Sequence, residues 1–200
     1  MSYLPAGDFA SWLIEIREAI EGTGTTDVPC GTCVACCSSS QFVHIAPDER
    51  DALAHIPTTL LFPAPRMPRG HVLMGYDEQG RCPMLRAEGC SIYEHRPRTC
   101  RTYDCRVFPA AGVLPAEPDK VMITEQAARW QFSVEGPAAI GAAAAVLATT
   151  VFIRERGAEL GEVAPHTSTQ LAVAAVRVHD LFINNEPSVP EVQVRLTRQR

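Results

Sequence analysis

The most regular pattern of apolar and polar positions lies near the start of the chain. Apolar residues recur there at spacings of three and four: Phe9, Trp12, Leu13, Ile16 and Ile20. This spacing places them on one face of an α-helix. Asp8 can accept hydrogen bonds from the N–H groups of the first turn, and Gly22 can end the helix. The pattern therefore predicts an amphipathic helix between these two residues.

The middle of the chain favours short elements. We expect a strand at 42–45, a helix at 47–56 and a short helical stretch at 92–95. Four prolines within 57–68 argue against regular structure in that segment. Residues 71–76 and 81–85 are expected to form a small hairpin around the turn at 77–80.

Helical patterns dominate the last part of the chain. We expect helices at 119–132, 137–156 and 168–184, a connector at 107–118, and an edge strand or frayed end from residue 186. Residues 136–153 carry no charge, and alanine is the most frequent residue among them. Alanine contributes little to membrane insertion, so this segment is expected to be a buried helix of a soluble core rather than a membrane span.

Composition and charge exclude several classes of protein. With 200 residues, of which 46% are hydrophobic, the chain can bury a core without disulfides as staples. A formal net charge of -5 argues against a phosphate-binding surface, so nucleic acid is not an expected partner. The first 20 residues contain acidic side chains and lack the basic and apolar regions of a signal peptide. We therefore expect a cytoplasmic location, where thiols stay reduced.

Eight cysteines supply the candidate chemistry. In a reducing compartment they are expected to be thiolate ligands or catalytic thiols rather than disulfides. The first four form the pattern C-x-x-C-x-x-C-C: Cys30, Cys33, Cys36 and Cys37. A C-x-x-C turn directs both sulfurs toward one centre, as in zinc knuckles and iron–sulfur loops. Adjacent side chains diverge, so Cys36 and Cys37 are expected to be a difficult pair for one tetrahedral ion.

The other four cysteines are spaced more widely: Cys82, Cys90, Cys100 and Cys105. Between residues 81 and 106, six arginines and three acidic residues leave a surplus of three positive charges, which lowers thiol pKa values and offsets the charge of thiolates. The spacing is compatible both with two separate four-thiolate sites and with one metal centre shared by the two cysteine groups. Because a site built from the first group alone would strain the adjacent pair, we expect the two groups to meet in one folding unit.

These cysteines resemble a family, the YkgJ-type cysteine-cluster proteins of bacteria and archaea, described as zinc- or iron-chelating and marked by C-x-x-C-x-x-C-C. Further family patterns stand here as C-P-M-L at 82–85 and as G-C-S-I-Y-E-H-R-P-R-T-C-R at 89–101. The resemblance covers about residues 28 to 106. Asp104 occupies a position where the family frequently has proline. The resemblance implies zinc or an iron–sulfur cluster as the cofactor and leaves the reaction open.

Arginines and histidines supply the remaining candidates. Arg96 and Arg101 flank Cys100 in the R-P-x-x-C-R signature, and we assign them a supporting role, in which a guanidinium stabilises thiolate charge without binding the metal. The six histidines show no helical pairing typical of a metal site, so surface or core positions are expected for them. His95 is the exception, because it lies inside the second cysteine block and can replace a thiolate or donate to one.

The sequence therefore predicts an α+β fold: a small cysteine-rich metal-binding core with a short hairpin, packed by helices from both ends. The expected division is an N-terminal helix and loop at 1–27, the cysteine-cluster domain at 28–106, and a helical region at 107–200 that packs on the same domain. The leading function is a thiolate metal-binding protein that serves redox chemistry, as an iron–sulfur oxidoreductase would, or metal-dependent modification of another protein. The alternatives are a structural zinc module for protein interaction and a metal chaperone or store.

Overall fold

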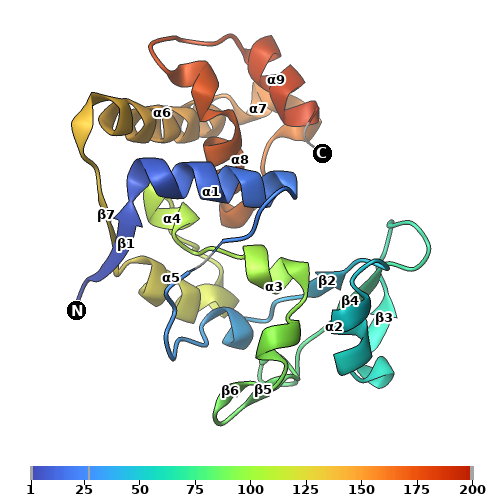
Figure 1. The fold of residues 1–200 in the computed structure, drawn as a ribbon. Helices are drawn as coiled ribbons and strands as arrows, with labels where there is room; N and C mark the ends of the chain where they lie inside the picture. Colours follow the sequence, from blue (N-terminus) through green and yellow to red (C-terminus); the bar gives the residue numbers. More distant parts are fainter. Residues whose placement is uncertain (1, 27, 199–200) are drawn as a thin grey trace. The chain divides into compact units, whose positions relative to one another are not determined.

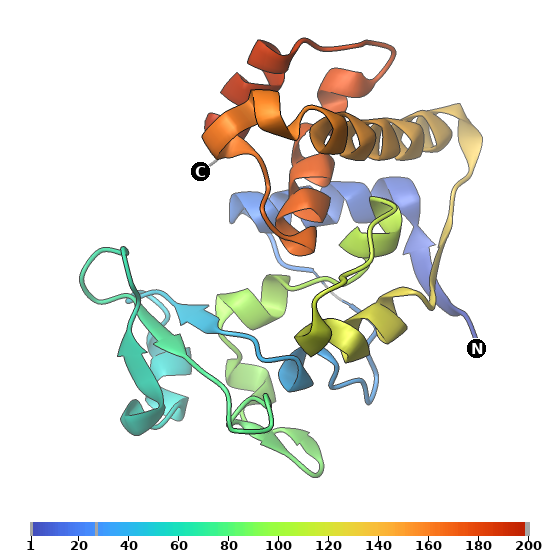
Figure 2. The same ribbon diagram turned by 180° about the vertical axis from the view of Figure 1, so that it is seen from behind.

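The computed structural model describes residues 2–26 and 28–198 (Figures 1 and 2). About 50% of the chain is helix and 11% is strand, which confirms the predicted α+β class. The chain divides into two compact units, each described here by itself. Unit 1 consists of the described parts of Met1–Gly24, Asp104–Ala116 and Thr124–Arg200, and unit 2 of those of Thr25–Tyr103 and Glu117–Ile123. The domain boundaries expected at 28 and 106 stay predictions.

Unit 1 combines a two-stranded parallel sheet with most of the longer helices. Strand β1 (Leu4–Asp8) pairs with β7 (Trp130–Ser133), with Leu4 opposite Trp130. The helices are α1 (Phe9–Glu21), α4 (Val107–Ala110), α6 (Gly136–Glu155), α7 (Gly157–Leu160), α8 (Ser168–Val178) and α9 (Val189–Thr197). Helix α5 (Val121–Ala127) contributes residues to both units.

Helix α1 begins and ends where the sequence predicts. Asp8 Oδ1 accepts a hydrogen bond from the Ser11 N–H at 2.8 Å, and Gly22 ends the helix in the left-handed conformation, at φ 80°. The buried face of the helix meets β7, because the Trp12 and Phe132 ring centroids lie 4.6 Å apart. The first helix is therefore anchored by a residue more than a hundred positions later in the chain.

Helix α6 has 20 residues. By length and composition alone it could cross a membrane, and 33% of its 18-residue apolar stretch is buried. One of its faces packs against α1, α4 and α8 in unit 1. The hydroxyls of Thr149 and Thr150 on that face donate to the carbonyls of Ala145 and Val146, at 2.7 and 3.2 Å. These bonds satisfy the two buried polar groups within the helix itself. That the protein has no membrane partner stays a prediction.

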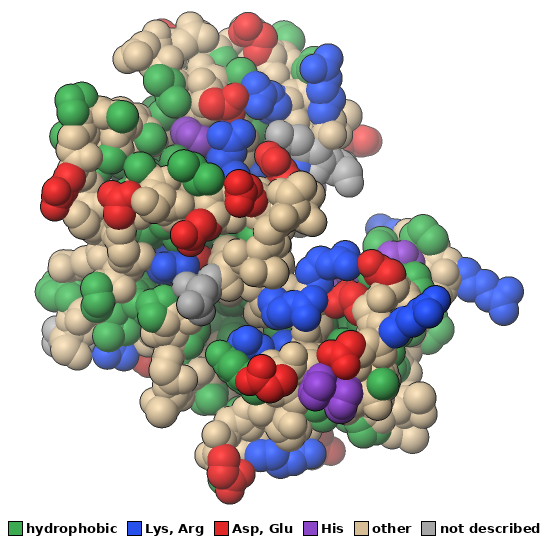
Figure 3. Space-filling model, in the orientation of Figure 1, with side chains coloured by type: hydrophobic (Ala, Val, Ile, Leu, Met, Phe, Trp, Pro, Cys, Tyr) green, Lys and Arg blue, Asp and Glu red, His purple; other side chains and the backbone are tan. Residues whose placement is uncertain are grey.

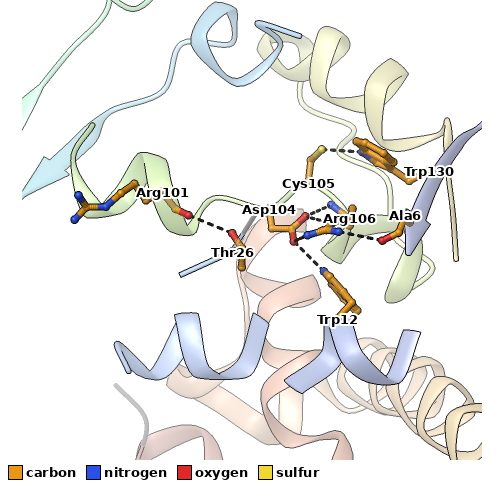
Figure 4. Close-up of polar contacts among 8 residues, drawn as sticks. All are labelled: Ala6, Trp12, Thr26, Arg101, Asp104, Cys105, Arg106 and Trp130. Carbon is orange, nitrogen blue, oxygen red and sulfur yellow. Dashed lines mark hydrogen bonds and ion pairs between the residues drawn. The ribbon is translucent and has the colours of Figure 1, made fainter. Parts of the chain in front are cut away.

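A buried ion pair fastens the segments of unit 1 (Figure 4). Arg106 Nη2 lies 2.8 Å from Asp104 Oδ2, and the two side chains are 6% and 0% exposed. The Trp12 indole donates to the same carboxylate oxygen at 2.8 Å, and Arg106 Nη1 donates to the Ala6 carbonyl at 3.0 Å. The pair thereby connects the second segment of unit 1 to both β1 and α1.

Unit 2 contains short strands and helices around its own core. A three-stranded antiparallel sheet has the order β2 (Val43–Ile45), β4 (Val72–Met74), β3 (Leu61–Pro63), and β5 (Leu85–Arg86) pairs with β6 (Gly89–Cys90). The helices are α2 (Arg50–His55) and α3 (Arg98–Thr102), with 3₁₀ helices η1 (Cys36–Ser38), η2 (Thr58–Leu60), η3 (Tyr93–His95) and η4 (Pro118–Lys120). Cys82, Cys90 and Cys100 pack against the apolar core of this unit.

The hairpin predicted around the turn at 77–80 is wrong. Its first strand, β4, pairs with β2 and β3 instead. The turn itself forms, and Asp77 Oδ1 accepts hydrogen bonds from the N–H groups of Gln79 and Arg81 at 3.0 and 2.8 Å. These local bonds use donors that a hairpin ladder would need, and Pro83 has none to offer. The short hairpin of the fold is β5–β6 instead.

Three segments expected to be irregular or extended contain other elements. The proline-rich segment 57–68 contains β3, where Pro63 is tolerated because β3 lies at the edge of its sheet. The expected connector 107–118 contains α4. The tail from residue 186 forms α9, because Ser188 and Glu191 make a reciprocal capping box.

The helix expected at 119–132 ends early. Helix α5 stops at Ala127, and the residues from Trp130 form β7. Pairing with β1 overrides the local helical pattern here, because the hydrogen bonds come from a strand that is distant in sequence.

Replacing Arg106 with alanine is expected to lower the free energy of unfolding by about 3–5 kcal/mol, because Asp104 would stay buried without its cation. The matched control is Arg156→Ala, which removes an exposed pair with Glu159 and should change stability far less. Urea unfolding followed by circular dichroism measures both variants. Equal losses for the two variants would contradict a special role for the buried pair.

Candidate metal centre

The first cysteines lie on a tight turn of unit 2. The Cys33 N–H donates to the Cys30 carbonyl at 2.9 Å, and Gly31 adopts φ 56°, a conformation that glycine tolerates best. The Ala35 N–H points at the Cys33 sulfur, with an N–Sγ distance of 3.5 Å. Cys30 is exposed and Cys33 is half-buried. The turn thus has the backbone geometry of a C-x-x-C loop, in which amides face a ligand sulfur.

Cys36 and Cys37 begin the 3₁₀ helix η1, and their sulfurs lie 3.9 Å apart. Two sulfurs of a tetrahedral zinc site are about 3.8 Å apart when the Zn–S bonds are about 2.3 Å. The sequence predicts that side chains of neighbouring residues diverge, but the tight 3₁₀ turn brings this pair together. The two thiols can therefore serve a single ion.

A backbone hydrogen bond joins the two cysteine groups within unit 2. The Cys82 N–H donates to the Cys37 carbonyl at 2.7 Å, and two residues earlier Gly80 O accepts from the Ser40 N–H at 2.8 Å. Gly80 has φ 74°, a conformation that glycine tolerates best, and an added Cβ would lie 2.5 Å from the Ser40 hydroxyl, so glycine suits this position. The two groups therefore meet through the backbone at Cys37 and Cys82. That their sulfurs share a metal stays a prediction.

Cys100 is held in place by side chains that the sequence analysis overlooked. It lies on α3, whose first N–H group, at Arg98, donates to the buried carboxylate of Glu49. The Thr99 hydroxyl donates to the His44 carbonyl of β2 at 2.6 Å. The only sequence signal for these contacts is the preference of carboxylates for helix N-termini. Glu49 and Thr99 therefore fix the position of α3, which carries Cys100.

The thiols of unit 2 influence one another electrostatically. A hydrogen bond from the Cys37 thiol, aided by the charge of Arg96, lowers the pKa of Cys36 to about 7. The pKa of Cys37 rises, because its proton is held in that bond, because it is buried, and because Cys82 and Cys100 lie nearby. The first proton of the pair thus leaves near neutrality, while the second is retained.

The second group behaves differently from Cys36. Burial raises the pKa of Cys100 to about 12, and the nearby sulfurs of Cys36, Cys82 and Cys90 add to the shift. Burial also raises the pKa of Cys82, followed by the effects of Cys90 and Cys36. Crowded, desolvated thiols of this kind stay protonated until a bound cation compensates the negative charge that forms when they ionise.

Arg96 and Arg101 differ in their surroundings. The Arg96 guanidinium lies over the Tyr93 ring at 3.5 Å from its centroid, and its charge lowers the pKa values of Cys36 and Cys100. Arg101 instead lowers the pKa of the Asp51 carboxyl, and its carbonyl accepts a hydrogen bond from the Thr26 hydroxyl at 3.2 Å (Figure 4). The structure therefore brings Arg96 to the thiols, and the role of Arg101 stays a prediction.

Cys105 belongs to unit 1 and is buried there. The Trp130 indole donates to its sulfur at 3.2 Å (Figure 4). The other seven cysteines belong to unit 2. Nothing in the sequence distinguishes Cys105 from its neighbours in the second group, because its burial results from the distant strand β7. Its predicted role as a metal ligand stays a prediction.

Comparison with known proteins identifies a family match. The family called CxxCxxCC, described as a putative zinc- or iron-chelating domain, matches residues 29–128, which is half of the chain and includes all eight cysteines. Neither the curated proteins nor the solved structures contain a match to this chain.

In the reduced, metal-free protein, Cys36 is expected to be alkylated at lower pH than Cys100, because only the thiolate reacts. With a pKa of about 7, Cys36 is half ionised near neutrality, whereas Cys100, with a pKa of about 12, stays protonated. Iodoacetamide labelling over a pH series, followed by peptide mass spectrometry, measures both, and the exposed Cys30 serves as the reference. Labelling of Cys100 as early as Cys36 would contradict the electrostatic account.

Proposed function

This chain belongs to the CxxCxxCC family of zinc- or iron-chelating domains, and on that premise we propose that unit 2 binds one metal ion through four cysteine thiolates. The proposed ligands are Cys37 and the three sulfurs that raise its pKa: Cys36, Cys82 and Cys100. The observation that carries the proposal is the 3.9 Å separation of the Cys36 and Cys37 sulfurs, which suits a single tetrahedral ion.

Zinc is the ion that these residues fit best. In an iron–sulfur cluster the cysteine ligands are distributed over several irons, whereas a single ion needs its sulfurs at the short spacing seen here. When bound, zinc would act as a cation that neutralises the thiolates and supplies folding free energy. In this proposal the fold directs the four sulfurs toward the ion, backbone N–H groups donate hydrogen bonds to sulfur, and the Arg96 guanidinium lies beside the site.

Four thiolates would close the coordination shell, which is typical of structural rather than catalytic zinc. The metal would then hold together η1, the segment at Cys82 and α3, which come from distant parts of the chain. Under this proposal the protein is a zinc-stabilised module that offers a surface to a partner. Its thiolate ligands need a reducing compartment, so the proposal includes a cytoplasmic location.

An iron–sulfur cluster is the second candidate, and it is favoured by the three cysteines at two-residue spacing, Cys30, Cys33 and Cys36. It would support redox chemistry or modification of another protein. Anaerobic purification followed by metal analysis and an absorption spectrum separates the two candidates. A colourless protein with stoichiometric zinc supports the first, and a coloured protein with iron and sulfide supports the second.

Serine substitution of each proposed ligand is expected to abolish stoichiometric zinc, because the hydroxyl is a poor ligand for this ion. Zinc analysis after gel filtration measures the stoichiometry, and X-ray absorption should give a sulfur shell at about 2.3 Å in the parent protein. The matched control is Cys30→Ser, the same substitution on an exposed cysteine of the same segment. Serine variants of the other four cysteines test the sequence-based expectation that Cys30, Cys33, Cys90 and Cys105 are ligands too. If the four proposed sulfurs suffice, these variants keep the zinc.

Arg96→Gln is expected to weaken zinc binding by about 10-fold to 100-fold, because the thiolates at Cys36 and Cys100 lose the positive charge beside them. Arg101→Gln is the matched comparison, with a smaller effect expected. Competition with a chromophoric chelator measures both affinities. Equal affinities for the parent protein and Arg96→Gln would show that the guanidinium does not tune the site.

A further inference from the structure

A second cluster of metal-ligating side chains lies in unit 2, outside the thiols. Asp51 and His55 belong to α2, and His95 ends the 3₁₀ helix η3. One carboxylate oxygen and one nitrogen from each ring all lie within 4.8 Å of one another. Histidine and acidic side chains are visible together at the surface around α2 (Figure 3). The sequence does not reveal this cluster, because His95 joins the other two residues only through the fold.

The two imidazole rings are oriented by the same residue. His95 Nδ1 lies 2.9 Å from Asp51 Oδ2, and His55 Nδ1 lies 3.7 Å from Asp51 Oδ1 and 2.9 Å from the Asp51 carbonyl oxygen. The rings are stacked, with centroids 3.5 Å apart and planes 4° from parallel. Both Nδ1 atoms therefore face the carboxylate, and one acidic group serves two histidines.

The separations match those around a metal ion. Two ligand atoms of a tetrahedral zinc site with bonds of about 2.0–2.1 Å are about 3.3 Å apart. The distances from His95 Nδ1 to Asp51 Oδ2, 2.9 Å, and from His55 Nδ1 to Asp51 Oδ1, 3.7 Å, fall on either side of this value, although they involve the two different oxygens of the carboxylate. One ligand atom from each of the three residues lies within 4.8 Å of the others. Small rotations of these side chains, which are 65%, 39% and 42% exposed for Asp51, His95 and His55, can equalise them.

We propose that Asp51, His55 and His95 form a second metal site, which binds a divalent zinc ion through one carboxylate oxygen and two imidazole nitrogens. Binding would move the proton of each neutral ring from Nδ1 to Nε2 and would replace the hydrogen bond to the carboxylate with two bonds to the metal.

The chemistry of this site differs from that of the thiolate centre. Two imidazoles and a carboxylate form a harder donor set than sulfur, and three protein ligands leave a position for water. Exposure of all three side chains makes that position accessible from solvent. The ion would also cross-link α2 to η3, the element that precedes Arg96 and α3, and so would steady the segment that leads to Cys100.

Neighbouring charges set limits on affinity. The hydrogen bond from His95 is the largest cause that lowers the pKa of the Asp51 carboxyl, and the charge of Arg101 adds to it, so the carboxylate is ionised and ready to bind a cation. The charge of Arg101 opposes a second cation nearby. The site is therefore expected to bind zinc more weakly than the thiolates do, and to fill only after them.

The test uses the full chain with its thiolate centre already loaded with zinc. Equilibrium dialysis against added zinc should load one further ion per chain, and X-ray absorption should then show added nitrogen and oxygen ligands at about 2.0–2.2 Å beside the sulfur shell. His55→Ala and Asp51→Asn should each weaken this second binding step by more than about 100-fold, which exceeds the usual cost of losing an outer partner of a ligand.

The matched control is His71→Ala. His71 also stacks on a histidine of the same unit, His44, with ring centroids 5.1 Å apart and an Nδ1–Nε2 distance of 2.9 Å. The His71→Ala substitution should leave the second zinc-binding step unchanged. That outcome separates a defined site from general zinc binding by pairs of histidines. Absence of a second step in the parent protein, or equal binding in all variants, would overturn the proposal. The sulfur shell reports the thiolate centre separately, so failure of either site is recognisable.

Discussion

The hydrogen bond from the Cys82 N–H to the Cys37 carbonyl is the contact on which the proposed thiolate site depends. It joins two cysteine groups separated by about 45 residues, so folding must offset the entropy of closing a long loop before these sulfurs meet. The result is a cluster of half-buried thiols in which burial, and after it the charges of neighbouring sulfurs, raises the pKa values of Cys82 and Cys100. Such a cluster is stable while its members are protonated, or when a cation is shared among them. Metal binding and local folding are thus two aspects of one equilibrium.

Much of the fold follows from local pattern, and much of the remainder depends on distant pairing. The helical spacing around Trp12 and the cap at Asp8 are sufficient to predict α1, because a capped amphipathic helix is specified by neighbours in sequence. Strand β7 is not predictable in this way, since its partner is the first strand of the chain. The cysteine pattern likewise identified the metal-binding segment. It could not show that Cys105 is enclosed by unit 1, because that burial depends on Trp130.

Asp104 illustrates how a departure from a family pattern acquires a structural reason. Where the family resemblance leads one to expect proline, this chain has a carboxylate that accepts hydrogen bonds from Trp12 and Arg106. Proline could make neither bond. The residue therefore belongs to the core of unit 1, although it lies beside a cysteine of the family signature. In contrast, Glu49 supports the thiolate segment from a position outside any signature, because it caps α3. A residue such as Asp104 can therefore lie beside a motif without supporting the metal site, and a residue such as Glu49 can support that site from outside the motif.

The discontinuous course of unit 1 has a consequence for the order of events on the ribosome. Strand β1 is translated before its partner β7, which follows more than 120 residues later. At about 5–20 residues per second, β1 and the apolar face of α1 wait roughly 6–25 s for that partner. Most of unit 2 is a single stretch, Thr25–Tyr103, that emerges during this interval. The cysteine-rich unit can therefore mature while the first strand and helix are still unpaired, and those two elements are the ones that nascent-chain chaperones would be expected to shield.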